Sequence, residues 1–175
     1  VDAGKSTVVA ALVQVGCDYL GDEAIAIRPG TLDLVAHPKP LTLDATSRAA
    51  LDLPAPGDPH LAVEALRSDV VRLAGDVGPV DLVLLPEYRG PRPVDPAGSD
   101  EPDSTTRLDP ADALRALLGS TLNLARAGAQ GLADLCRVAE EVPFVRVRHR
   151  GSRDLAARLV DGDLSDGAGR GATSG

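Results

Sequence analysis

Short apolar segments alternate with helical patterns along the chain. Apolar residues recur at helical spacing between Lys5 and Val15, and compact apolar runs follow at 24–27, 32–36 and 80–85. The run VDLVLL at 80–85 is almost continuously apolar, which is typical of a strand buried on both faces. This alternation predicts an α/β fold in which helices flank a mixed sheet.

The rest of the chain completes this organisation. Helical spacing predicts helices at 60–74, 111–127, 131–141 and 153–160, and strands are expected at 17–20 and 144–150. The segment 93–109 is rich in Pro, Ser and Asp and predicts a loop, and 162–175 predicts a disordered tail. We therefore expect one domain over residues 1–160 and a tail over 161–175.

Composition narrows the possible partners. The chain has 175 residues, 43% of them hydrophobic, and a net charge of −8. An acidic surface repels a phosphate backbone, so we expect no nucleic-acid partner. No apolar run approaches the roughly 20 residues of a membrane span, so no membrane partner is expected either. Cys17 and Cys136 lack the spacing of a metal site, and unpaired thiols in a cytoplasmic protein are expected.

The chain opens with VDAGKST, which has the form of the second half of a phosphate-binding loop. The full motif is G-x-x-x-x-G-K-[ST], and its first glycine would precede Val1, so the chain is expected to be a fragment. In such loops, backbone N–H groups surround a phosphate, the lysine offsets its charge and the hydroxyl is a magnesium ligand. The candidate nucleotide-binding residues are Gly4, Lys5, Ser6 and Thr7, with Ser6 as a metal ligand.

Two other interpretations of VDAGKST need to be weighed. The first is a surface turn before an ordinary helix, although the apolar helix that follows GKST directly makes this weaker. The second is a GTPase, which would read guanine through an N-K-x-D motif. The chain has a single asparagine, Asn123, which is followed by Leu124, so no such motif can be built.

An acidic pair, Asp22 and Glu23, follows one helix and one short strand after the loop. In α/β sheets, ligands bind beyond the carboxyl ends of strands, so this pair is expected near the phosphates. A carboxylate there can bind Mg²⁺ or accept a proton from an attacking hydroxyl. The alternative is a charged turn between two strands.

These motifs, in this order, resemble the HPr kinase family and, more closely, HPr-kinase-related proteins of bacterial gene clusters. The matching segments are GKST at 4–7, YLGDEAIAI at 19–27, HPKPLTL at 37–43, LVLLPEYRGPRP at 82–93, RLDPADALRALL at 107–118 and VPFVRV at 142–147. The resemblance covers about residues 1 to 160. It implies a fold like that of the phosphoenolpyruvate carboxykinase and HPr kinase group.

The resemblance also implies an activity. It points to an ATP- and Mg²⁺-dependent protein serine kinase whose partner is a serine-bearing protein or peptide, with a homo-oligomer as a possible state. Lys5 and Ser6 match the loop lysine and hydroxyl, and Asp22 matches the proton acceptor. Glu23 matches a second, magnesium-associated acid that is usually Asp in the family. That difference, together with a missing family signature segment, leaves open an inactive ATP-binding regulatory or scaffold module.

Several basic residues could assist this chemistry. Arg89 and Arg92 follow the run at 80–85, where an arginine could neutralise a transferring phosphoryl group. Arg146, Arg148 and Arg150 alternate and are expected on one strand face. Lys39, held between two prolines, could reach a phosphate. For each of these positions, a solvated surface charge is the other interpretation.

Overall fold

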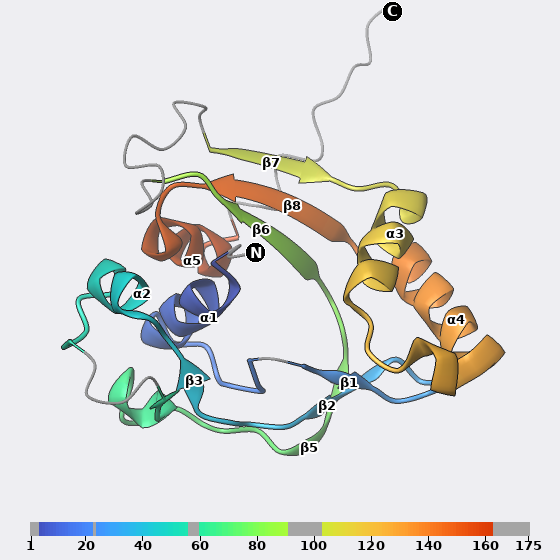
Figure 1. Cartoon of the computed structure of the whole chain (residues 1–175), viewed down its shortest axis with the longest axis horizontal. Helices are drawn as coiled ribbons and strands as arrows, with labels where there is room; N and C mark the ends of the chain where they lie inside the picture. The colour runs from blue at the N-terminus through green and yellow to red at the C-terminus, as the bar shows by residue number, and fades with distance from the viewer. Residues whose placement is uncertain (1–3, 23, 56–59, 91–102, 163–175) are drawn as a thin grey trace, which may run out of the picture.

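The computed structural model describes residues 4–22, 24–55, 60–90 and 103–162, which form helices and short strands in three small sheets (Figure 1). The helices are α1 (Lys5–Gln14), α2 (Ala45–Ala50), the 3₁₀ helix η1 (Val63–Ala65), α3 (Pro110–Ser120), α4 (Leu124–Glu141) and α5 (Ser152–Val160). The strands are β1 (Ala26–Ile27), β2 (Asp33–Ala36), β3 (Leu41–Thr42), β4 (His60–Leu61), β5 (Gly75–Pro79), β6 (Val83–Tyr88), β7 (Ser104–Arg107) and β8 (Phe144–His149).

The three strands β6, β8 and β7 form a mixed sheet, in the order β6-β8-β7. β6 runs parallel to β8, from the pair Val83–Phe144 to the pair Tyr88–His149, whereas β7 is antiparallel to β8. A parallel pair needs a long crossover, and here the residues between 88 and 144 supply it. The two parallel strands therefore end side by side at Tyr88 and His149.

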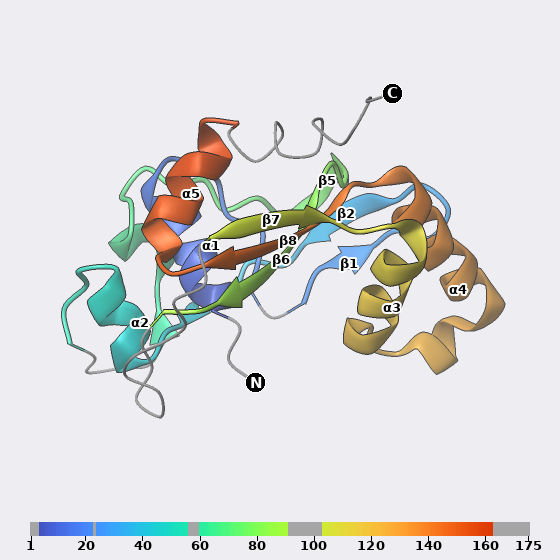
Figure 2. The same cartoon turned by 90° about the horizontal axis from the view of Figure 1, so that it is seen from above.

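One face of β8 packs against two helices. Its sequence FVRVRH alternates, so Val145 and Val147 point to the buried face. There they form a core cluster with Val8 of α1 and Leu155 of α5. Each fully buried valine or leucine contributes roughly 1.5–3 kcal/mol to stability. This burial fixes α1 and α5 beside the sheet (Figure 2).

The other two sheets are small and antiparallel. β1, β2 and β5 pair in that order, with a register shift between Leu34 and Val35, and β3 pairs with β4. In Figure 1 the β1-β2-β5 sheet lies below α1 and the mixed sheet lies above it. A second core cluster joins α1 to β3, where Leu41, Leu43 and Tyr19 are at most 1% exposed.

α3 and α4 form a helical hairpin at one end of the mixed sheet. Asp109 caps α3 by accepting a hydrogen bond from the Asp112 amide at 2.8 Å, and Pro110 occupies its first turn. The hairpin packs its apolar face on Phe144 of β8, which is 1% exposed. Within the described residues, none of the helices has the length and apolar character that crossing a membrane requires.

The predicted helix at 60–74 is wrong. Only η1 is helical there, and β4 occupies its start. The segment around Arg72 pairs instead with Tyr19, whose amide donates to the Val71 carbonyl and whose carbonyl accepts from the Leu73 amide, both at 3.0 Å. The backbone hydrogen bonds to Tyr19 outweigh the weak local preference for helix that the spacing of apolar residues indicated. The strand expected at 17–20 is correspondingly reduced to a single bridge at Tyr19.

The loop predicted at 93–109 is wrong in its last part. Residues 104–107 form β7, whose β-branched residues Thr105 and Thr106 suit a strand and pair with the edge of β8. Residues 91–102 lie outside the described part of the chain. The tail predicted from 162 onward also lies outside it, except for Gly162.

Other expectations differ in their boundaries. The helix predicted at 111–127 ends at Ser120, because the Thr121 hydroxyl donates to the Leu117 carbonyl at 2.7 Å and Asn123 adopts a left-handed conformation. The strand predicted at 80–85 runs from 83 to 88. Helices near 5–15, 131–141 and 153–160 and the strand near 144–150 are confirmed. The α/β class is also confirmed, with three sheets among the described residues where one mixed sheet was expected.

Candidate functional site

α1 begins with an open N-terminus at Gly4. Gly4 is the N-cap residue, with φ 74° and ψ 17°, and no side chain caps the helix. The helical ladder starts with the Val8 amide, which donates to the Gly4 carbonyl at 2.9 Å. The amides of the three residues between them have no partner within the helix. Together with the helix dipole, such amides favour an anion at this end.

This helix terminus lies at the carboxyl ends of two parallel strands. An ideal Cβ on Gly4 would stand 3.5 Å from Tyr88 Cβ and 4.0 Å from His149 Nε2, the last residues of β6 and β8. Ligands of α/β proteins bind at this position relative to the sheet. The local sequence permits the arrangement because glycine adopts a positive φ without strain.

The predicted loop residues occupy the first turn of α1. The Lys5 side chain is exposed, and Ser6 is half-buried. Thr7 is buried, and its hydroxyl donates to Ser47 Oγ of α2 at 2.9 Å. The Thr7 side chain therefore ties α1 to α2, and the group that Thr7 can offer to a ligand is its backbone amide.

Asp22 lies in a bend between Tyr19 and β1 and is half-buried. The segment before it is firmly held. The Tyr19 hydroxyl donates to the Lys39 carbonyl at 2.7 Å, and the His37 amide donates to the Leu20 carbonyl at 3.0 Å. Lys39 itself has an exposed side chain. Among the residues that the structure describes, no ion pair joins Asp22 to Lys5. Glu23 lies outside the described residues.

The expected metal site consists of oxygen ligands. Within the described ranges, no three His, Cys, Asp or Glu side chains come together in a way that could bind a metal ion. Mg²⁺ at a phosphoryl-transfer site usually relies on one or two carboxylates plus the phosphates themselves. The Ser6 hydroxyl and the Asp22 carboxylate are oxygen donors of this kind, so their chemistry fits Mg²⁺.

His149 is a residue that sequence reasoning missed. It is fully buried, and neither ring nitrogen has a hydrogen-bond partner among the described residues. Its ring meets that of Tyr88 edge-on, with centroids 5.7 Å apart. Burial lowers the pKa of His149. The backbone of Gly151, which lies near the ring but outside hydrogen-bond geometry, and the charge of Asp103 oppose that effect only in part. Leaving a buried polar group unpaired costs about 1–3 kcal/mol, so this side chain calls for an explanation.

The alternation of residues along β8 could have identified His149 from the sequence. It places His149 on the same face as Val145 and Val147, the face that packs against α1. A histidine that continues an apolar face at the end of a strand is therefore a candidate for a ligand contact as well as for the core.

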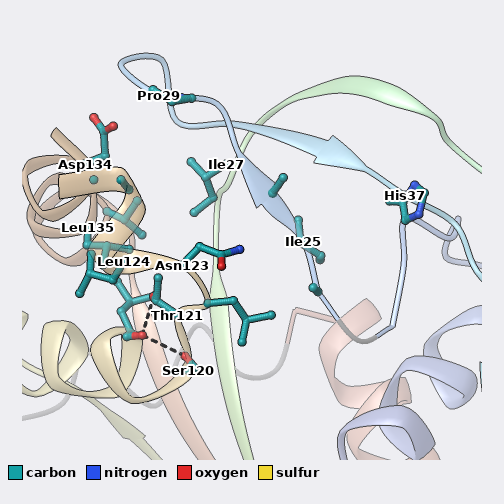
Figure 3. Close-up of a pocket in the computed structure, with 17 residues that line it drawn as sticks. Ile25, Ile27, Pro29, His37, Ser120, Thr121, Asn123, Leu124, Asp134 and Leu135 are labelled. Atoms are coloured by element: carbon teal, nitrogen blue, oxygen red, sulfur yellow. Dashed lines mark hydrogen bonds between the residues drawn. The ribbon is translucent and has the colours of Figure 1, made fainter.

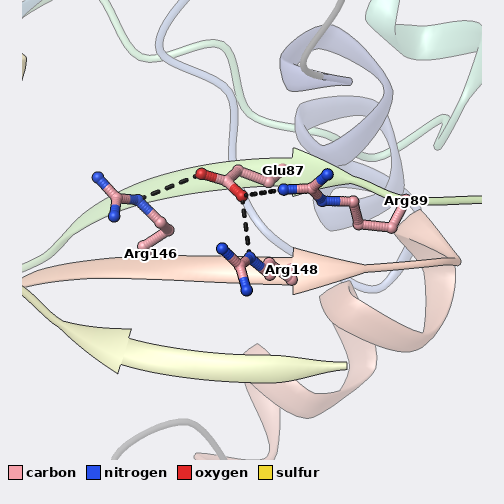
Figure 4. A network of polar contacts seen from close by, with 4 residues as sticks. All are labelled: Glu87, Arg89, Arg146 and Arg148. Atoms are coloured by element: carbon pink, nitrogen blue, oxygen red, sulfur yellow. Dashed lines mark hydrogen bonds and ion pairs between the residues drawn. The ribbon is translucent and has the colours of Figure 1, made fainter. Parts of the chain in front are cut away.

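On the opposite face of the sheet, Glu87 is surrounded by three arginines (Figure 4). Its carboxylate lies 3.0 Å from Arg89 Nη2, 3.3 Å from Arg146 Nε and 3.1 Å from Arg148 Nε. Burial raises the pKa of Glu87, but hydrogen bonds from Arg148 and Arg89 and the charge of Arg146 outweigh it, so the pKa is lowered. The shared face predicted for Arg146 and Arg148 is confirmed.

The remaining predicted cations are placed differently. Arg150 lies beyond the end of β8, and its backbone amide donates to the Asp103 carboxylate at 3.1 Å. Arg89 directs Nη2 to Glu87, while its Nε is buried without a partner among the described residues. Arg92 lies outside the described part of the chain. Arg89 is therefore next to the ends of the parallel strands but is already engaged with a carboxylate.

A cleft of about 770 Å³ separates β1 from the α3–α4 hairpin (Figure 3). Its walls are mainly apolar, with Ile25 and Ile27 on one side and Leu135 on the other. At one end lies His37, whose carbonyl would stand 3.2 Å from a Cβ on Gly21. The cleft therefore reaches the segment that carries Asp22. Its volume is in the range of ligand-binding clefts.

Cys17 and Cys136 are unpaired, and both are half-buried and not fully in the core. Comparisons of the chain with protein-family models, with curated proteins and with solved structures find no match.

Proposed function

We propose that the chain is an ATP-dependent protein serine kinase of the HPr-kinase-like type, with Mg²⁺ as cofactor. The observation that carries the proposal is the start of α1. Gly4, in a left-handed conformation, opens an uncapped helix beside the carboxyl ends of β6 and β8. This is the place and the geometry in which α/β proteins bind phosphates.

The first turn of α1 would hold the polyphosphate. The backbone amides of Lys5, Ser6 and Thr7 point out of the helix end and would donate to phosphate oxygens. The Lys5 ammonium would offset charge at the β- and γ-phosphates. Mg²⁺, held by Ser6 with Asp22 or Glu23, would neutralise charge that develops on the transferred group.

Asp22 would accept the proton of the attacking serine hydroxyl. The backbone just before Asp22 is anchored by hydrogen bonds of Tyr19 and His37, and Asp22 itself is half-buried. Phosphoryl transfer needs positioning and charge neutralisation more than covalent chemistry, and a carboxylate at this point would help to position the attacking hydroxyl. The acceptor would be a serine of a protein or peptide.

Nucleotide binding is the first test. Binding of MgATP to the chain is measured by calorimetry for the wild type, for Lys5→Ala and for Arg115→Ala. Arg115 is an exposed cation on α3 paired with Asp112, so its removal changes net charge equally, away from the site. The proposal expects Lys5→Ala to abolish binding and Arg115→Ala to leave it unchanged. Equal binding by all three proteins would contradict it.

A nucleotide-binding module without kinase activity is the second candidate. Glu at position 23, where the related pattern has Asp, favours it. Asp22→Asn separates the two candidates. A kinase loses turnover in this variant but keeps its affinity for MgATP, whereas a binding module has no turnover to lose.

A further inference from the structure

The imidazole of His149 lies against the start of α1, yet nothing in the proposed mechanism uses it. Its side chain is fully buried, and neither nitrogen is paired among the described residues. Its Nε2 atom lies near Gly4, 4.0 Å from the position that a Cβ on Gly4 would occupy. Two independent features therefore point to the same spot: helix amides without a partner inside the helix, and a buried ring nitrogen without a partner among the described residues.

Both features would be satisfied by one kind of ligand. The amides are donors, and Nε2 is a donor when it carries a proton. An oxyanion accepts hydrogen bonds from donors on several sides, and a polyphosphate offers several such oxygens. An apolar ligand would leave every one of these groups unpaired.

We propose that His149 is a binding residue of the phosphate site, with Nε2–H donating to an oxygen of a polyphosphate held at the N-terminus of α1. This inference rests on the proposed function and adds to it a residue outside the GKST motif. The ring is held for this contact by the edge-on packing of Tyr88 and by the backbone pairing of β8 with β6.

Polyphosphate binding at His149 depends on pH. Two titratable groups act on the ring directly: Tyr88 of β6, which meets it edge-on, and Asp103 before β7, whose charge raises its pKa. On the neighbouring helices, Asp154 of α5 lies against Gly151, and Lys5 of α1 has an exposed side chain. Burial lowers the pKa of His149 in the free protein, and a bound polyphosphate raises it. Binding therefore takes up a proton, and affinity falls as pH rises through the pKa of the bound state.

The test follows the histidine rings directly. The chain has three histidines, so their ring signals can be assigned in NMR spectra by substitution. MgATP, and separately magnesium tripolyphosphate, is titrated into the chain. The expected result is a shift of the His149 ring signals with both compounds and none for His60, which lies at the β3–β4 pair next to Thr42. His149 signals that stay fixed while MgATP binds would overturn the inference.

Variants give a second readout. His149→Phe keeps a planar ring and removes both nitrogens, and His60→Phe is the matched control. MgATP affinity is measured from pH 5.5 to 8. A lost hydrogen bond to a charged group predicts roughly tenfold weaker binding or more at the acid end for His149→Phe, and a flatter pH profile. Thermal unfolding verifies that the variant is folded.

The outcomes separate the two proposals. If MgATP does not bind to the wild type, the proposed function fails and the role of His149 fails with it. If MgATP binds, depends on Lys5 and is indifferent to His149→Phe at every pH, only the role of His149 is overturned.

Discussion

The hydroxyl of Thr7 donates a 2.9 Å hydrogen bond to the hydroxyl of Ser47, and so the first turn of α1 is fastened to α2. The hydroxyls of Ser6 and Thr7 therefore have different roles. Thr7 is buried and structural, whereas Ser6 is half-buried and remains available to a ligand. The two positions should respond oppositely to substitution.

Thr7→Val keeps the shape of the side chain and removes the hydrogen bond. We expect a loss of about 1 kcal/mol in the free energy of unfolding and unchanged MgATP affinity, because the Thr7 amide is retained. Ser6→Ala should show the reverse, with unchanged stability and impaired Mg²⁺-dependent turnover. Urea unfolding, nucleotide titration and a phosphoryl-transfer assay of both variants check this. A Thr7→Val variant that is stable but no longer binds MgATP would contradict it.

Gly4→Ala should harm both folding and binding. Gly4 has φ 74°, where an alanine costs roughly 1–2 kcal/mol. Its new Cβ would meet Tyr88 at an ordinary 3.5 Å, so the cost comes from the backbone and not from a clash. Gly30→Ala is the matched control, with φ 83° and open space around it. Both variants should lose similar stability in urea unfolding, but only Gly4→Ala should weaken MgATP binding.

Glu87→Gln should destabilise the sheet by leaving three arginines without their shared carboxylate. Because the pKa of Glu87 is lowered in the folded state, its contribution is full above its ordinary pKa and is lost as pH falls through the lowered value. The group is about a third exposed, so solvent screens part of the effect. Unfolding curves from pH 3 to 7 should converge for wild type and variant at the acid end. A constant difference would exclude this account.

The unliganded protein should also lose stability on mild acidification because of His149. Its pKa is lowered in the folded state, so between that value and its ordinary value near 6.5 the unfolded chain binds more protons. Stability therefore rises with pH across this window and is fully present above 6.5. His149→Phe should remove that part of the slope. Thermal melting of both proteins from pH 5 to 8 measures it.

The elements with strong local signals were predictable. GKST before an apolar helix indicated α1, and the alternation in FVRVRH indicated β8 and placed Arg146 with Arg148. Segments whose state depends on a distant partner were not. Residues 71–73 pair with Tyr19 through a bridge at Arg72, and Ser104–Arg107 forms a strand because β8 has a free edge there. Apart from the β-branched Thr105 and Thr106 of β7, no local pattern contains that information.

Only the loop residues of the candidate site could be predicted from the sequence. The loop residues were named by motif, and the structure adds their neighbours at the ends of β6 and β8. His149 lies far from the motif in sequence and becomes its neighbour only through the parallel pairing of those strands. The motif groups Thr7 with the ligand-binding residues. Its contact with Ser47 depends on where α2 packs, and the motif does not contain that information.

Phosphoryl transfer that depends on Asp22 is the property that most directly distinguishes a kinase from a nucleotide-binding module. The chain is incubated with γ-labelled ATP and Mg²⁺, with HPr and with serine-bearing proteins encoded near it as acceptors. Asp22→Asn is compared with Asp81→Asn, an exposed aspartate before β6 that gives the same change of charge. We expect label on a serine for wild type and for Asp81→Asn. In Asp22→Asn the label should be lost while the affinity for MgATP is retained. Label that survives in Asp22→Asn, or MgATP binding without label on any acceptor, would contradict it.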